Sequence, residues 1–167
     1  NLSFAVVAAS PVFGGTLKSV DAAPAKAMRG VKQVVKLADA VAVVADNTWR
    51  AKEALLALKP EWDDGPNATI SSQSIFAAMD AALDAGTFKT DHSTGDADAV
   101  LKGAKKIVEA TYRVPYLAHA TMETVNCTAH FENDKLTVWG GFQDGLGARA
   151  AAAKFAGISI DDVSLHH

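Results

Sequence analysis

Short apolar runs in the first part of the chain predict strands. Residues 2–8 and 31–37 are rich in valine and other apolar residues, a pattern typical of partly buried strands. Residues 41–45 are apolar at every position, as expected for a strand that is covered on both faces. The sequence therefore predicts a small β-sheet near the start of the chain.

A helix is predicted directly after the third apolar run. Asp46-Asn47-Thr48 is a strong start signal, and residues 49–58 supply the helical pattern. Trp49, Leu55 and Leu56, together with Ala45 or Ala51, are expected on the inner face of this helix, with Trp49 as a core anchor. Two shorter helices are predicted over residues 22–28 and 75–83.

The second half of the chain has a different rhythm. Residues 86–95 are polar and without period, which indicates a linker or a domain boundary. Asn133-Asp134 is typical of a tight hairpin turn. Asp144 is a suitable cap for a helix over residues 145–156. Four strands are predicted around these features, over residues 105–114, 125–131, 135–139 and 163–165. Runs of strands and helices in this order favour an α+β fold.

Composition and charge exclude several classes of protein. The net charge is -3 and acidic and basic residues are interleaved, so no basic block is present to follow a nucleic-acid backbone. The one cysteine, Cys127, cannot form a disulfide within the chain or a multi-cysteine metal site. No apolar run reaches the roughly 18–20 residues needed to cross a bilayer. We therefore expect neither a nucleic-acid partner nor a transmembrane segment.

Both ends of the chain fall inside predicted strands. The chain begins in the first strand without an initiator Met, a charged leader or a cleavage site. Its last strand has just begun when the chain stops at His166-His167, two residues that are either native or part of an affinity tag. We expect a piece of a longer protein.

His119 and Glu123 form the first candidate site. They are four residues apart, so on a helix they would share a face and could bind a metal. However, Pro115 precedes them and β-branched residues follow, which favours a loop. A third ligand with supporting spacing is also missing. We expect a loop histidine and a loop carboxylate, with no metal.

Residues 140–147, Gly-Gly-Phe-Gln-Asp-Gly-Leu-Gly, form the second candidate site. This corner follows a predicted strand and opens a predicted helix, where glycines let a ligand approach the backbone and the helix start favours anions. The glycine spacing fits neither the dinucleotide-binding fingerprint nor a phosphate-binding P-loop. The corner is thus either a ligand site or a simple turn.

Several motifs together resemble one known family. In chain order they are residues 10–15, 30–35, 41–49, 62–67, 114–123 and 139–157. The first four resemble the a/b hammerhead domain of the aldehyde oxidase and xanthine dehydrogenase family, and the last two resemble the start of its molybdenum-binding region. The version most similar is the large subunit of isoquinoline 1-oxidoreductase and its aldehyde-dehydrogenase relatives. Thr121 and Thr124 stand where proline is common, and Gly-Gly-Phe-Gln replaces a more usual Thr-Gln pairing.

The resemblance implies a division of the chain and a set of site residues. Residues 1–88 would form a hammerhead-like domain, and residues 89–167 would form the first part of a molybdenum-cofactor-binding domain. Gln143, with Phe142 and Gly141, would contact the cofactor, while His119 and Glu123 would border the pocket. The family's catalytic glutamate and its Gly-Gly-Phe-Gly loop lie outside residues 1–167. We therefore expect no catalytic residue, no cofactor and no activity in this piece alone.

The resemblance also implies chemistry and partners for the full subunit. The family hydroxylates a carbon next to nitrogen in an N-heterocycle, or an aldehyde carbon, with oxygen from water. The cofactor would be molybdenum on molybdopterin cytosine dinucleotide. Electrons would pass to iron–sulfur clusters on a small partner subunit, with a cytochrome c subunit as a further partner. The compartment, bacterial cytoplasm or periplasm, stays open.

Two other functions compete with this hypothesis. One is a stand-alone binding module that holds a small anionic ligand at the corner of residues 140–147. The other is a small metal hydrolase built on His119 and Glu123, which would need a third ligand and a general base.

Overall fold

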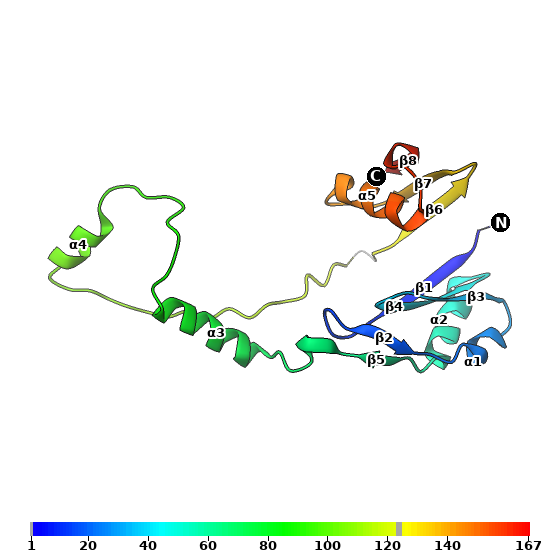
Figure 1. Cartoon of the computed structure of the whole chain (residues 1–167), viewed down its shortest axis with the longest axis horizontal. Helices are drawn as coiled ribbons and strands as arrows, with labels where there is room; N and C mark the ends of the chain where they lie inside the picture. The colour runs from blue at the N-terminus through cyan, green and yellow to red at the C-terminus, as the bar shows by residue number, and fades with distance from the viewer. Residues whose placement is uncertain (1, 123–124) are drawn as a thin grey trace. The chain divides into compact units, whose positions relative to one another are not determined.

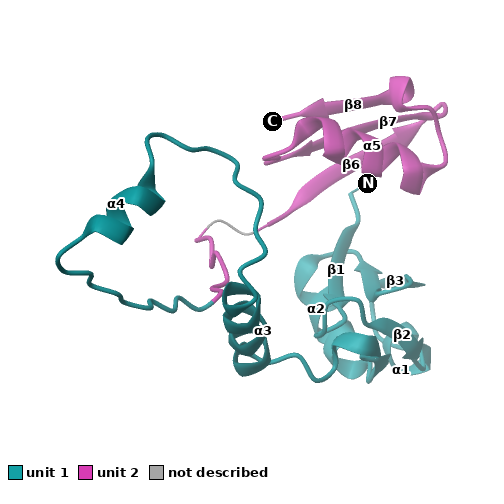
Figure 2. Ribbon diagram, turned by 60° about the vertical axis from the view of Figure 1, so that its left-hand side comes forward, with its two compact units in different colours: residues 1–115 teal, residues 116–167 magenta. Residues whose placement is uncertain are grey.

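The computed structural model describes residues 2–122 and 125–167. The chain divides into two compact units, residues 1–115 and 116–167 (Figure 2). The expected α+β fold is confirmed. The expected boundary at 88/89 lies earlier than this division and stays a prediction. In the described ranges, no helix combines the length and the apolar content that a membrane span requires.

The first unit contains two small antiparallel sheets (Figure 1). The larger has the order β1-β4-β3, and the smaller pairs β2 with β5. The strands are β1 (Phe4–Ala9), β2 (Thr16–Ser19), β3 (Val31–Lys36), β4 (Ala40–Ala45) and β5 (Glu61–Asp63). The helices are α1 (Ala23–Lys26), α2 (Thr48–Ala57), the 3-10 helix η1 (Gly65–Asn67), α3 (Ser72–Asp84) and α4 (Ala97–Gly103).

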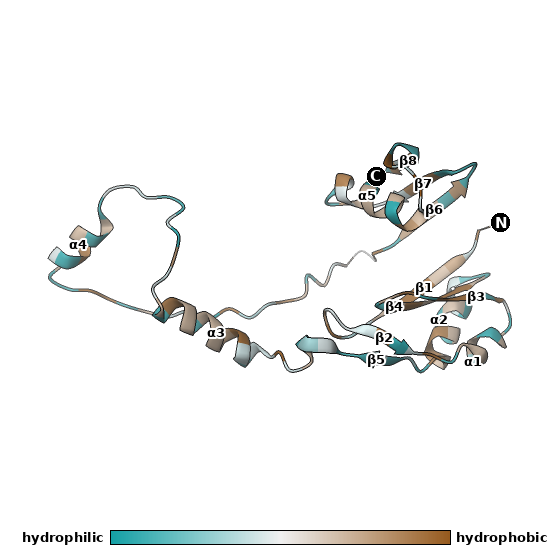
Figure 3. Ribbon diagram, in the orientation of Figure 1, coloured by the Kyte–Doolittle hydropathy of each residue, from teal (hydrophilic) through white to brown (hydrophobic). Residues whose placement is uncertain are grey.

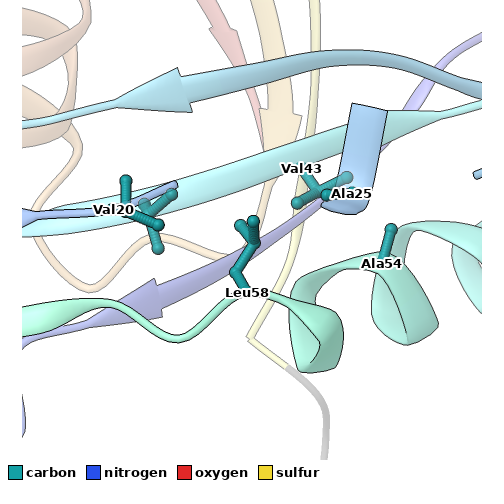
Figure 4. Close-up of a cluster of buried hydrophobic side chains, with 6 residues drawn as sticks. Val20, Ala25, Val43, Ala54 and Leu58 are labelled. Atoms are coloured by element: carbon teal, nitrogen blue, oxygen red, sulfur yellow. The ribbon is translucent and has the colours of Figure 1, made fainter. Parts of the chain in front are cut away.

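β4 is the centre of the first unit, as its sequence predicts. It pairs with a strand on each side, and Val41 and Val43 are fully buried. The rest of this buried cluster comes from Val20, from Ala25 of α1, from Ala54 of α2 and from Leu58 at the end of α2 (Figure 4). In Figure 3, β1 and β4 are among the more hydrophobic parts of the ribbon. Small side chains on the helices let them lie close to the valine face of the sheet.

α2 begins where the sequence predicts, but its inner face matches the expectation only in part. Asn47 is the N-cap, and its side-chain oxygen accepts a hydrogen bond from the backbone N–H of Arg50 at 2.9 Å. The buried positions are Ala51, which was expected, and Ala54, and the expected Leu55 packs against the core. The expectation for Leu56 is wrong, because it is exposed. The expectation that Trp49 anchors the core is wrong, since 67% of its surface is exposed. The close approach of sheet and helix selects small residues for the contact, which turns Trp49 outward.

The second unit is a mixed three-stranded sheet with one covering helix (Figure 2). β6 and β7 form an antiparallel hairpin, and β7 and β8 run parallel with α5 as their connection. The elements are β6 (Cys127–Glu132), β7 (Lys135–Gly140), α5 (Gly145–Ala156), the 3-10 helix η2 (Ile160–Asp162) and β8 (Val163–His166). The buried core consists of Leu136, Val138, Ala153 and Val163.

One prediction for this unit, the hairpin turn at Asn133-Asp134, is confirmed. Asn133 and Asp134 have φ of 50° and 58°, the left-handed values that a tight two-residue hairpin turn requires. The Arg149 Nε–H donates to the Val163 carbonyl at 2.8 Å, which ties α5 to the start of β8. Together these features fix where β7 and β8 begin, and the candidate site lies at the opposite, carboxyl ends of the two strands.

Two strand expectations differ from the structure. β2 is not predicted, because it is four residues long and only Leu17 is partly buried. The strand predicted over residues 105–114 is wrong for this structure, since the described residues 104–122 contain no helix or strand. A strand needs a neighbour for its backbone hydrogen bonds. The structure pairs residues 105–114 with no other strand.

Candidate functional site

The corner between β7 and α5 is built by close approaches at two glycines. A Cβ on Gly140 would lie 3.2 Å from the Asn126 carbonyl oxygen and 3.3 Å from the Phe142 ring. A Cβ on Gly147 would collide with an Asp144 carboxylate oxygen. That carboxylate caps α5 by accepting the Gly147 N–H at 2.8 Å. Side chains at either position would displace the corner, so the glycines serve local packing.

Phe142 and Gln143 point to different environments. Phe142 is partly buried and packs against the core of the second unit. Gln143, the next residue, is exposed, as is Gly141 before it. Because Phe142 is held in the core and Asp144 is held at the helix start, the corner presents the Gln143 amide outward. This amide can both donate and accept hydrogen bonds.

An open hollow of about 830 Å³ lies beside Gln143, at the carboxyl ends of the parallel strands β7 and β8. The Trp139 and His166 rings stack there, with centroids 5.6 Å apart and an angle of 16° between the planes. Carboxyl ends of parallel strands are a common place for ligand sites. The lining residues are His119, Thr121, Val125, Asn126, Trp139, Gly140, Gly141, Gln143, His166 and His167.

The hollow matches a mid-sized polar ligand in size and chemistry. Ligand pockets in proteins typically measure roughly 300–1,000 Å³. The wall offers the Gln143 amide and imidazole rings as hydrogen-bonding groups, with the Trp139–His166 stack as a flat surface. A Cβ added at Gly141 would have no neighbouring atom of the described residues within 4 Å, so the backbone there is open to a ligand. A pterin with its phosphate presents donors, acceptors and a flat ring, so these residues fit such a group.

The residues expected from the sequence are partly brought together. Gly141, Gln143 and His119 border one hollow, whereas the Phe142 side chain packs away from it. Glu123 lies outside the described residues. Across the described residues, no group of three or more His, Cys, Asp or Glu side chains is placed to hold a metal ion.

Sequence reasoning missed the contribution of Trp139 and His166. They are neighbours because β7 and β8 pair in parallel with Trp139 opposite His166. That register depends on the crossover through α5 and has no local signal. The pattern of strand, helix and strand was the only available hint, because such units place their strand ends at one edge.

Comparison with known families decides the assignment. Residues 81–167 match the family described as the molybdopterin cofactor-binding domain. This chain belongs to that family. The matched molybdopterin cofactor-binding region contains every residue that lines the hollow. The resemblance to the molybdenum-binding subunit of the molybdenum hydroxylases is confirmed as membership of this cofactor-binding family. No curated protein matches the chain.

Solved structures share the fold over almost the whole chain. Quinoline 2-oxidoreductase from Pseudomonas putida 86 superimposes with a TM-score of 0.66 at 16% identity, covering 98% of this chain and 26% of that one. A Cu,Mo-CO dehydrogenase in its carbon monoxide reduced state gives 0.67 at 18%, covering 99% and 27%. Reconstituted CO dehydrogenase from Oligotropha carboxidovorans gives 0.63 at 17%, covering 99% and 27%. The chain thus spans about a quarter of the length of these structures.

Proposed function

We propose that residues 1–167 are part of the molybdopterin-binding subunit of an oxidoreductase. The full subunit would hydroxylate a carbon next to nitrogen in an N-heterocycle, or an aldehyde carbon, with water as the oxygen source. The observation that carries this proposal is the hollow beside Gln143, which is built wholly from residues of the matched cofactor-binding region. Its position at the ends of β7 and β8 suits a ligand that reaches further into a larger protein.

The corner residues would hold one side of the cofactor. The Gln143 amide would donate to an oxygen of the metal centre or the pterin, and Gly141 would let the cofactor approach the backbone. Phe142 would contribute through its backbone, because its ring packs in the core. His119 and Glu123 would border the pocket. When bound, molybdenum on molybdopterin cytosine dinucleotide supplies the two-electron redox chemistry.

The remaining parts of the machinery would lie outside residues 1–167. A catalytic general base and a second glycine-rich cofactor loop are needed, and neither is assigned to a residue of this chain. We infer that the isolated piece is inactive. Iron–sulfur clusters on a small subunit, with a cytochrome c subunit as a further partner, would carry the electrons away.

The test compares the full enzyme with the isolated piece. Both are purified after expression in a host that makes molybdopterin, and molybdenum is measured by mass spectrometry. Turnover is followed with a dye acceptor on N-heterocycles and aldehydes in water enriched in oxygen-18. We expect molybdenum, turnover and labelled product from the full enzyme alone. A full enzyme without molybdenum, or a product without label, would refute the proposal.

The stand-alone binding module remains the competing function. Its support is the capped start of α5 beside the polar wall of the hollow. The same preparations decide between the two. Tight phosphate binding by residues 1–167, with no molybdenum in the longer protein, would favour the binding module.

A further inference from the structure

Residues 105–114 have the composition of a β-strand and none of its partners. The segment contains no glycine or proline, and Ile107, Val108, Thr111, Tyr112 and Val114 are β-branched or aromatic. In the structure it forms neither helix nor strand. Figure 1 shows it as plain ribbon between α4 and β6. Composition and observed state therefore disagree.

One side of the segment is apolar and exposed. Side chains in an extended chain alternate between two faces, which places Val108, Ala110, Tyr112 and Val114 together. Val108, Tyr112 and Val114 are 81%, 88% and 77% exposed. Single exposed apolar residues are normal, but a row of them on one face indicates a surface that is buried in the working protein.

The opposite face already has a polar contact. It carries Glu109, Thr111 and Arg113 beside one apolar residue, Ile107. The Arg113 guanidinium pairs with Asp80 of α3 at 2.6 Å. This contact leaves the apolar face as the one without a partner. Residues 86–95 give the contrast: they are also exposed and also without helix or strand, but they are polar and bounded by Gly86 and Gly95. An ordinary loop looks like residues 86–95.

We propose that residues 105–114 form a strand that pairs with the edge of a sheet in the part of the same subunit outside residues 1–167. This inference rests on the proposed function, which places the chain in a longer subunit. The solved structures support a partner strand within the same subunit. They superimpose on 98–99% of this chain and are about four times longer, so most of their length lies outside the shared part. This face carries Lys106 at its start, but from Val108 to Val114 it has no charge. Such an apolar row suits a permanent contact within a subunit, because transient interfaces are more polar. Backbone pairing to an edge strand would satisfy the segment's N–H and C=O groups.

Hydrogen–deuterium exchange on the full subunit tests the pairing. Amides of residues 107–114 should exchange at least about a hundredfold more slowly than those of residues 86–95 in the same sample, as paired amides do. Exchange at the loop rate in a subunit that contains molybdenum would overturn the strand and leave the proposed function intact. Slow exchange that appears only after the iron–sulfur subunit is added would also overturn it, because the occupant would then be the partner.

Two neighbouring substitutions in the full subunit provide a matched pair. Tyr112→Asp places a charge on the apolar face, and Thr111→Asp places the same charge on the polar face. We expect Tyr112→Asp to lower the melting temperature and to speed exchange over residues 107–114, with Thr111→Asp close to wild type. Equal effects of the two substitutions would contradict the assignment of the faces.

Discussion

β4 and β6 are strands of six residues each, yet they lie at opposite extremes of burial. β4 has a strand on each side and helices packed on its valine face, and its residues are buried or partly buried. Among the strands that the structure describes, β6 pairs with β7 alone, and all six of its residues are exposed. The core of the first unit is thus covered by helices and strands of the same unit. The second unit has a smaller core, and its strand β6 and the ends of β7 and β8 are exposed or partly exposed.

This difference separates stability from function. A closed core stabilises the first unit, because the valine face of its larger sheet is covered by helices of the same unit. The second unit leaves the ends of β7 and β8 open, and the hollow beside Gln143 forms at those ends. Function requires such exposure, because a cofactor must reach the backbone. Each prediction below breaks or sharpens this contrast, in order of decreasing effect.

The largest effect is expected from Leu58→Ala in the first unit. Leu58 is 4% exposed within the core cluster, so its loss leaves a cavity. The expected cost is about 2–5 kcal/mol in the free energy of unfolding. Leu56, two residues earlier and 69% exposed, is the matched control, and Leu56→Ala should stay within about 0.5 kcal/mol. Chemical denaturation of the purified chain measures both, and equal costs would show that the core is placed wrongly.

The second effect concerns Gln143 in the full enzyme. Losing one hydrogen bond to a buried polar centre costs about 1.5–3 kcal/mol. Gln143→Ala should therefore lower turnover roughly ten- to a hundredfold, since about 1.4 kcal/mol is a factor of ten. The stability of residues 1–167 should barely change, because the side chain is exposed.

Phe142→Ala is the matched control for Gln143→Ala. Its ring packs in the core of the second unit, so this substitution should reduce stability in the isolated chain, which Gln143→Ala should not. Turnover and molybdenum content are measured beside denaturation. Wild-type turnover and molybdenum in the Gln143→Ala enzyme would remove Gln143 from the cofactor site.

Local signals in the sequence predicted most of the elements whose structure depends on neighbouring residues in the chain. The apolar run of β4, the cap Asn47 and the turn Asn133-Asp134 each fix a structure within a few residues, and each is confirmed. The Trp49 prediction failed because helix periodicity gives a face but not the distance to the sheet. At a close approach, small residues take the inner positions.

The site was predictable only at its corner. The glycine-rich run of residues 140–147 marks this corner in the sequence, and two of its members, Gly141 and Gln143, border the hollow. The Trp139–His166 stack depends on the parallel register of β7 and β8, which arises from packing of α5 over many residues. Residues 105–114 show the converse. Their local pattern indicates a strand, but a strand also requires a neighbour that the pattern cannot supply.

The third effect is expected at the cap of α5. Asp144→Ala removes the acceptor of the Gly147 N–H and should cost about 1 kcal/mol in the stability of the second unit. Asp144→Asn should retain most of this stability, because asparagine caps helices about as well as aspartate. Thermal unfolding followed by circular dichroism measures both variants. If the asparagine variant is as unstable as the alanine variant, the carboxylate stabilises the corner by charge and not by capping.

The smallest effect is expected from the ion pair between Arg113 and Asp80. The two side chains are half-exposed, so water screens their attraction and holding them together costs side-chain entropy. A double-mutant cycle with Arg113→Ala and Asp80→Ala should give a coupling of about 0–1 kcal/mol in the isolated chain. The pair of Arg50 on α2 with Asp46, which lies just before the N-cap of that helix, is the control, because it belongs to the unit with the closed core. Raising the salt concentration should weaken both couplings. A coupling well above 1 kcal/mol for Arg113 and Asp80 would mean that residues 105–114 are already held firmly against α3. The contrast between a closed first core and an unpartnered segment would then have to be given up.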